Sequence, residues 1–258
     1  MYSILVDITK CTGCEKCVKA CIKTNRLNPD KADYDRAASK DGLSENRFLS
    51  IIELKENRFA RKSCMHCLEP SCVAACLVGG LTKTKEGAVV YDETKCIGCR
   101  YCMLSCPYGI PRYEWSKTIP FMRKCSMCYD RLVVGEMPAC VQACPNEAII
   151  FGERKELLAK AKRIINSDNK YIKRVWGEND FGGSSVLYIS DMDLTKVGWK
   201  SDFTASIPDL TVPLVEKTPI IGGSVAATLI GLTWIVNRRN KIAKEKKQET
   251  MKGEKNEQ

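Results

Sequence analysis

The cysteines are the residues of this 258-residue chain best suited to do chemistry, because there are sixteen of them, in four groups of four with none left over. The first and third groups share the spacing C-x2-C-x2-C-x3-C. Three closely spaced thiolates can bind three corners of a 4Fe-4S cube, whereas the fourth cysteine is placed to reach a neighbouring cube. In chain order the groups are Cys11, Cys14, Cys17 and Cys21; Cys64, Cys67, Cys72 and Cys76; Cys96, Cys99, Cys102 and Cys106; and Cys125, Cys128, Cys140 and Cys144.

The second and fourth groups carry longer insertions between their second and third cysteines, C-x2-C-x4-C-x3-C and C-x2-C-x11-C-x3-C. Pro107 and Pro145 directly follow the last cysteine of the third and fourth groups, where proline ends the cysteine turn. No three cysteines have the C-x3-C-x2-C order that radical chemistry on S-adenosylmethionine requires. Since each group supplies enough ligands for one cube, the sequence predicts four 4Fe-4S clusters bound by all sixteen cysteines.

Disulfides and structural zinc are the alternative uses for so many thiols. Secreted disulfide scaffolds are usually short and lack repeated C-x2-C-x2-C runs. Zinc binds paired C-x2-C motifs, but it has no use for a third cysteine two residues further on. A zinc-stabilised basic binding module stays an alternative because the formal net charge is +10. Four cubes at about −2 each would leave the loaded protein near +2, so no nucleic-acid partner is needed.

His66 is the only histidine in the sequence, which leaves almost no material for histidine-based acid-base or nucleophilic catalysis. It lies between two cysteines in the run Cys64-Met-His-Cys67. Because cysteine already supplies four ligands per cube, we expect His66 to support a cluster rather than to bind iron. The sequence therefore predicts a non-catalytic protein whose metal does the chemistry.

The elements expected to position the cysteines are short. Apolar segments predict strands at 2–8, 48–54, 88–91, 148–151 and 186–190. The run VDITKCTGC at 6–14 recurs as YDETKCIGC at 91–99, which indicates an internal duplication. A helix is expected over 153–165, where one face is apolar: Leu157, Leu158, Ala161, Ile164 and Ile165. The glycine-rich stretch 177–185 lacks nucleotide-binding patterns and is expected to be a turn. The expected fold of residues 1–205 is therefore α+β.

Residues 218–237 are a stretch of 20 residues without a charged side chain, long enough to cross a bilayer as a helix. The prolines of 206–217 predict an extended linker before it, and 238–258 is predicted to be a basic tail without fixed structure. Six basic residues lie within 238–247, whereas the flank before the stretch has only Lys200 and Lys217. We therefore expect a single-pass membrane protein with a cytoplasmic C terminus and an extracytoplasmic cluster domain. The first residues show no export signal, so we expect either export on a partner's signal or a start that is not the original one.

This arrangement resembles the four-cluster ferredoxin-like subunits of membrane-bound molybdopterin oxidoreductases and of quinone-linked periplasmic nickel-iron hydrogenases. The resemblance covers nearly the whole chain and includes the formate dehydrogenase β subunit type, which also ends in one membrane helix. The motifs that carry it are CMHC at 64–67, CIGCRYCMLSCPYGIPR at 96–112, KCSMCYDR at 124–131, PACVQACP at 138–145 and GGSSVLY at 182–188. It implies a duplicated bacterial two-cluster ferredoxin-like domain with loop insertions, followed by one C-terminal transmembrane helix.

The resemblance also implies which cysteines share a cluster, since it pairs the first group with the fourth and the second with the third. The implied sets are Cys11, Cys14, Cys17 and Cys144; Cys125, Cys128, Cys140 and Cys21; Cys64, Cys67, Cys72 and Cys106; and Cys96, Cys99, Cys102 and Cys76. It implies a relay of single electrons between a catalytic subunit, either a nickel-iron hydrogenase or a molybdopterin oxidoreductase such as formate dehydrogenase, and a membrane quinone or cytochrome subunit. A soluble polyferredoxin that serves several enzymes is the alternative, and it requires 218–237 to be a core helix.

Overall fold

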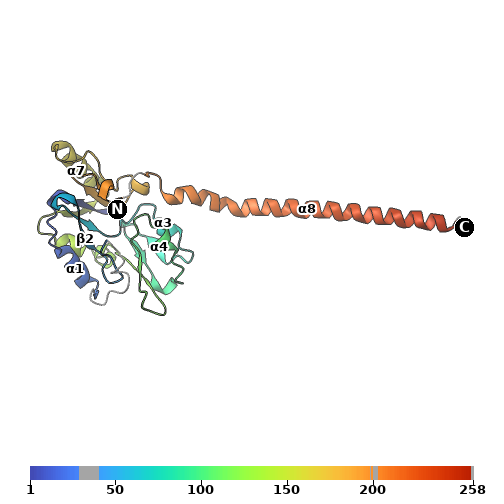
Figure 1. The fold of residues 1–258 in the computed structure, drawn as a ribbon, viewed down its shortest axis with the longest axis horizontal. Helices are drawn as coiled ribbons and strands as arrows, with labels where there is room; N and C mark the ends of the chain where they lie inside the picture. Colours follow the sequence, from blue (N-terminus) through green and yellow to red (C-terminus); the bar gives the residue numbers. More distant parts are fainter. Residues whose placement is uncertain (29–40, 198, 200–202, 257–258) are drawn as a thin grey trace. The chain divides into compact units, whose positions relative to one another are not determined.

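The chain folds into two compact units, Met1–Asp209 and Leu210–Gln258, in a computed structural model that describes residues 1–28, 41–197, 199 and 203–256. Lys200, which entered the prediction of membrane orientation, lies outside the described residues. Every cysteine is in the first unit, which is built from short strands and helices (Figure 1).

The largest sheet of the first unit has three strands in the order β8-β1-β9. The central strand β1 (Tyr2–Asp7) is antiparallel to β8 (Ile149–Glu153) and parallel to β9 (Val186–Ile189). Strand β1 is thus joined to segments that lie about 150 and 180 residues further along the chain. These strands agree with the predicted segments 2–8, 148–151 and 186–190.

Both faces of this sheet are buried, and the alternation of side chains along β1 separates them. Leu5 lies on the face covered by α7 (Arg154–Ser167), whose buried residues Leu157, Ala161 and Ile165 recur at helical spacing. Ile4, Val6 and other residues of the opposite face belong to a second apolar cluster that includes cysteines of the first and fourth groups. One strand therefore supports the protein core on one side and a cysteine-lined region on the other.

The remaining strands form three two-stranded antiparallel ribbons: β2 (Ser50–Glu53) with β3 (Phe59–Lys62), β4 (Leu81–Lys83) with β5 (Val89–Tyr91), and β6 (Arg112–Tyr113) with β7 (Met122–Arg123). Five short helices carry or follow the cysteines: α1 (Lys16–Thr24), α3 (Ser71–Ala74), α4 (Tyr101–Ser105), α5 (Tyr129–Leu132) and α6 (Ala139–Gln142). Short 3-10 turns also occur at Ile8–Lys10, Lys55–Asn57, Glu93–Lys95, Asp180–Gly182 and Leu194–Val197. Helix α1 contacts α6 and α3 contacts α4, so the helices of the first group meet those of the fourth, and the second those of the third.

A largely buried carboxylate ties two of these ribbons together. Both oxygens of Asp41 accept from Nη2 of Arg112 at 3.0 Å, and Lys62 Nζ lies 3.0 Å from Oδ2 of Asp41. Burial alone would raise the pKa of the Asp41 carboxyl, but the hydrogen bond from Lys62 and the positive charge of Arg112 outweigh it and lower the pKa. The ionised form of Asp41 is therefore part of the folded structure.

The glycine-rich stretch 177–185 forms a tight turn, as predicted, at the start of β9. Gly177 has a φ of +85°, and a Cβ at this position would clash with the carbonyl oxygen of Val186 and lie 2.6 Å from Oγ of Ser184. The turn is also held from α7, because Nε of Arg154 donates to the carbonyl of Ser184 at 2.9 Å and its Nη2 to that of Glu178 at 2.9 Å.

Helix α8 (Ile207–Asn256) corrects two predictions about the C-terminal region. The segment 206–217, predicted to be an extended linker, is helical from Ile207, and the helix continues through Pro213 and Pro219. The segment 238–258, predicted to be an unstructured tail, continues the same helix to Asn256. Proline in a helix interior removes one backbone hydrogen-bond donor and destabilises the helix by about 3 kcal/mol, which is why the prolines predicted an extended chain. Within α8, Ile207–Lys246 is long and apolar enough to cross a membrane, and none of its most apolar window is buried.

Candidate iron-sulfur sites

The first cysteine loop is shaped by the residues that lead into it from β1. Asp7 Oδ1 accepts from the backbone N–H of Thr9 at 3.0 Å and from its hydroxyl at 2.7 Å, which ends the strand in a 3-10 turn just before Cys11. The backbone then turns through Gly13, with a φ of 71°, and Glu15, with a φ of 55°, before α1 begins. Because two of the five residues 11–15 have a left-handed backbone conformation, the loop curves tightly and brings Cys11 and the cysteines that follow around one small space.

The third group repeats this local geometry 85 residues later. Asp92 Oδ1 accepts from the N–H of Thr94 at 3.0 Å and from its hydroxyl at 2.6 Å, just before Cys96. Gly98 has a φ of 71° and Arg100 a φ of 64°, and α4 follows. Equal spacing has therefore produced equal backbone conformation in the two tight cysteine runs.

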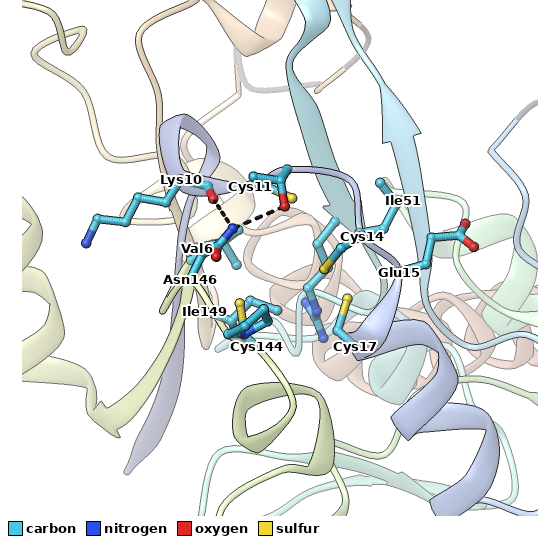
Figure 2. A pocket seen from close by; sticks show the side chains of 14 residues that line it. Val6, Lys10, Cys11, Cys14, Glu15, Cys17, Ile51, Cys144, Asn146 and Ile149 are labelled. Atoms are coloured by element: carbon cyan, nitrogen blue, oxygen red, sulfur yellow. Dashed lines mark hydrogen bonds between the residues drawn. The ribbon is translucent and has the colours of Figure 1, made fainter.

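The first and fourth groups meet at a cavity that opens beside β1. Cys11, Cys14, Cys17 and Cys144 line it, and Figure 2 shows the sulfur atoms of Cys14, Cys17 and Cys144 directed into the same space. The loop that carries Cys144 is fixed to the first loop because the side-chain amide of Asn146 donates to Thr12 Oγ1 at 3.1 Å and to the Lys10 carbonyl at 3.4 Å (Figure 2). The three closely spaced cysteines of one group are thus joined by the last cysteine of another.

A second cavity shows the reverse exchange. Cys125, Cys128 and Cys140 of the fourth group line it together with Cys21, the last cysteine of the first group. Several of the sulfur atoms have donors, among them Sγ of Cys125, which accepts from the Met127 N–H at 3.3 Å, and Sγ of Cys21, which accepts from the Asn25 amide at 3.5 Å. Such donors favour the thiolate form and lower the negative charge on the sulfur.

The second and third groups show the same grouping through their electrostatics. Burial raises the pKa of the Cys67 thiol, and the thiolates close enough to raise it further are Cys64, Cys106 and Cys72. Cys106 is the last cysteine of the third group, so three cysteines of the second group are joined by one from the third.

Cys102 gives the complementary set. Burial raises the pKa of its thiol, the hydroxyl of Tyr113 at 3.5 Å lowers it, and its charged cysteine neighbours are Cys96, Cys99 and Cys76. Cys76 in turn accepts a hydrogen bond from the Gly80 N–H at 3.2 Å. Two cavities thus bring together the eight cysteines of the first and fourth groups, and the electrostatic neighbours of Cys67 and Cys102 relate the second group to the third.

The donor sets suit a multi-iron cluster better than a single ion. All sixteen cysteines are free of disulfides. Within the described ranges, no three His, Cys, Asp or Glu side chains come close enough together to hold one metal ion. Zinc would need four sulfurs at about 2.3 Å from a common centre.

His66 is fully buried, and its imidazole is neutral. Its Nδ1 accepts from the Val89 N–H at 2.9 Å, so the proton resides on Nε2, for which the described residues offer no acceptor. Burial lowers the pKa of His66 well below its usual value, and the charges of Lys124, Lys83 and Arg61 lower it further. A neutral imidazole with a free N–H agrees with the predicted supporting role, in which it donates rather than binds iron.

The family relationship comes from comparison with known proteins. The family model for a 4Fe-4S dicluster domain matches residues 56–154, which include the second, third and fourth groups. The hydrogenase-2 operon protein HybA of Escherichia coli O157:H7 is 32% identical over 282 residues, covering 92% of this chain and 84% of HybA. This chain belongs to the 4Fe-4S dicluster iron-sulfur subunits.

Two further members of the family are similar over shorter ranges. The B subunit of the anaerobic dimethyl sulfoxide reductase of E. coli K12 is 39% identical over 167 residues, 62% of this chain and 77% of that protein. The iron-sulfur subunit of the nitrate-inducible formate dehydrogenase of E. coli K12 is 33% identical over 198 residues, 72% of this chain and 66% of that protein. The resemblance seen in the motifs is confirmed, and the chain is a non-catalytic electron-transfer subunit linked to oxidoreductases.

One residue of this iron-sulfur subunit near the sites was not predicted from the sequence. Arg61 lies on β3, is 1% exposed, and lines both the Cys11 cavity and the Cys21 cavity. In the sequence it is one of several basic residues in the run RFARK at 58–62, and nothing in its type or spacing separates it from a surface residue. Only the tertiary fold places it between two cysteine sets.

Proposed function

We propose that this subunit carries four 4Fe-4S clusters and relays single electrons through them. The cavity that Cys144 shares with Cys11, Cys14 and Cys17 carries this proposal. A fourth ligand from a distant motif is the arrangement by which two bacterial C-x2-C-x2-C-x3-C runs hold two cubes. Since Cys21 returns the exchange in the neighbouring cavity, the first and fourth groups make one interlocked pair.

The proposed ligand sets follow the neighbourhoods of the cysteines. They are Cys11, Cys14, Cys17 and Cys144 (set A); Cys21, Cys125, Cys128 and Cys140 (set B); Cys64, Cys67, Cys72 and Cys106 (set C); and Cys76, Cys96, Cys99 and Cys102 (set D). The equal backbone turns of the first and third groups, and the contacts of α1 with α6 and of α3 with α4, support an internal duplication of a two-cluster ferredoxin-like domain.

Electrostatic neighbours support a linear order of the four proposed sets. Cys17 of set A is an electrostatic neighbour of Cys140 of set B, and Cys125 of set B is a neighbour of Cys64 of set C. Cys72 of set C in turn neighbours Cys102 of set D. The proposed path is therefore A, B, C and D in either direction.

The two ends of this row reach the surface. Cys14 of set A and Cys99 of set D are the exposed cysteines of the chain, whereas every other cysteine is buried or half-buried. A bound 4Fe-4S cluster would accept and release one electron at a time. The protein would then exclude water from the inner sets and leave the outer two open to partners.

Helix α8 supports a membrane anchor for the subunit. Its polar side chains within the apolar stretch bind their own helix: the hydroxyl groups of Ser224, Thr228 and Thr233 each donate at 2.8 Å to the carbonyl four residues earlier. Such internal bonds reduce the cost of placing hydroxyl groups in lipid. We propose that 218–237 spans the membrane, with the basic residues after it in the cytoplasm and the cluster unit outside.

We propose one kind of partner subunit for each end of the row of clusters. One end of the row would serve a catalytic subunit, either a nickel-iron hydrogenase or a molybdopterin oxidoreductase such as formate dehydrogenase. The other end would serve an integral membrane subunit that binds quinone or haem. The relatives named above are proteins of hydrogenase, dimethyl sulfoxide reductase and formate dehydrogenase systems, which supports this general placement.

Elemental analysis of the intact membrane complex tests the cluster proposal. The subunit, purified with its partners in detergent, should contribute about 16 iron atoms per copy and absorb broadly near about 400 nm. Electron paramagnetic resonance during stepwise reduction should resolve four reducible 4Fe-4S signals from this chain. Iron well below that value, or zinc in its place, contradicts the proposal, and the copurified catalytic subunit identifies the substrate.

A further inference from the structure

Arg61 is a buried cation at the boundary between two cysteine sets. It lies on β3 opposite Ile51 of β2, and its carbonyl accepts from the hydroxyl of the buried Tyr188 at 2.8 Å. Backbone pairing on one side and this hydrogen bond on the other fix the position of its Cα. The side chain is therefore held inside the protein, with 1% of its surface exposed.

The guanidinium group reaches both sets. Arg61 lines the cavity of set A and also that of set B. Its Nη2 lies 3.9 Å from Sγ of Cys140, within reach of a long N–H···S hydrogen bond. Its Nε and Nη1 have no hydrogen-bond partner among the described residues, so two donor atoms remain available.

No carboxylate in the described part of the chain forms an ion pair with Arg61. Other arginines behave differently, since Arg58 pairs with Asp191 and Arg112 with Asp41. An unpaired buried charge with unmade hydrogen bonds is strongly unfavourable. The groups able to compensate it are the thiolates of sets A and B and the anionic clusters proposed to bind there, each about −2 when oxidised.

We propose that the positive charge of Arg61 raises the reduction potentials of both clusters, the one bound by set A and the one bound by set B. Reduction adds one negative charge to a cluster, and a fixed cation nearby stabilises the reduced form more than the oxidised form. The donors of arginine are spread over three nitrogen atoms of a planar fork and can face two acceptors on opposite sides, whereas the donors of a lysine ammonium all lie on one nitrogen. The inference rests on the proposed ligand sets, and it assigns the two clusters a common electrostatic control.

Redox titration of the intact complex, followed by electron paramagnetic resonance, tests this role with Arg61→Gln, Arg61→Lys and wild type. Arg61→Gln removes the charge and retains an amide donor, so two of the four midpoint potentials should fall while the other two stay unchanged. Arg61→Lys keeps the charge at one point, so one of those two potentials should fall and the other should stay. Arg154→Gln removes a half-buried arginine that lines neither cavity and donates to backbone carbonyls, so the two potentials that Arg61→Gln lowers should stay unchanged.

Iron analysis on the same samples separates this inference from the proposed function. Wild type with far fewer than about 16 iron atoms would contradict the four-cluster proposal itself. With full iron in both proteins, unchanged potentials in Arg61→Gln, or an equal fall of all four, would overturn the role of Arg61. If Arg61→Gln retains too little iron to titrate, Arg61→Lys decides, because two unaltered potentials there would also overturn it.

Discussion

The exchange of ligands between distant motifs makes a sharp prediction for Cys144. This residue belongs by sequence to the fourth group, yet it shares a cavity with Cys11, Cys14 and Cys17 of the first. Replacement by serine should therefore damage the cluster of set A and leave the cluster of its own motif in place. The neighbouring Cys140, four residues earlier, lines the other cavity and should behave in the opposite way.

The size of the effect follows from the number of ligands. Each set contributes one quarter of the iron, so loss of one cluster should lower the content from about 16 to about 12 atoms, and loss of one corner iron to about 15. The reference variants are Cys14→Ser for set A and Cys128→Ser for set B. Electron paramagnetic resonance of Cys144→Ser should lose the signal that Cys14→Ser loses, and Cys21→Ser should lose the signal that Cys128→Ser loses.

The alternative without exchange gives a different result with the same variants. If each motif holds its own cube, Cys144→Ser would match Cys128→Ser, and Cys21→Ser would match Cys14→Ser. That outcome would refute the ligand sets drawn from the cavities. The comparison does not depend on which signal belongs to which cluster, because each variant is matched only to another variant.

Four other predictions concern stability, membrane attachment and orientation. Asp41→Asn removes the carboxylate that two basic side chains share and should lower stability by about 3 kcal/mol, seen as earlier loss of the roughly 400 nm absorbance on heating; an unchanged melting curve would contradict the structural role of this ion pair. Gly177→Ala should lower the melting temperature more than Gly135→Ala does. Both glycines have a positive φ, but only Gly177 has close atoms where a Cβ would lie; equal melting temperatures would refute this. Truncation after Lys217 should release an iron-containing unit from membranes, whereas a protein that no longer folds would favour a core helix. A reporter fused after Gln258 should be active only in the cytoplasm, and activity outside would reverse the proposed orientation.

Local structure followed closely from the sequence where short-range chemistry sets it. The two runs with Asp, Thr, Cys and Gly at equal spacing adopt the same turns, because Asp7 and Asp92 each bind the N–H two residues on. The apolar face of α7 was visible in its periodicity, as was the alternation of β1. The helical conformation at the start of α8 was not visible in the sequence. The prolines of 206–217 predict an extended chain, whereas the observed helix continues through Pro213.

The sequence by itself determined the kind of chemistry, since cysteine type, number and spacing exclude most uses other than iron-sulfur clusters. It also determined that a stretch near the C terminus is long and apolar enough to cross a membrane. The resemblance implied that Cys144 joins Cys11, and the tertiary structure brings the two to one cavity, whereas the position of Arg61 at two cavities was decided by the tertiary structure alone. These placements depend on β1 pairing with strands about 150 and 180 residues away, and such long-range pairing leaves no mark in the local spacing of residues.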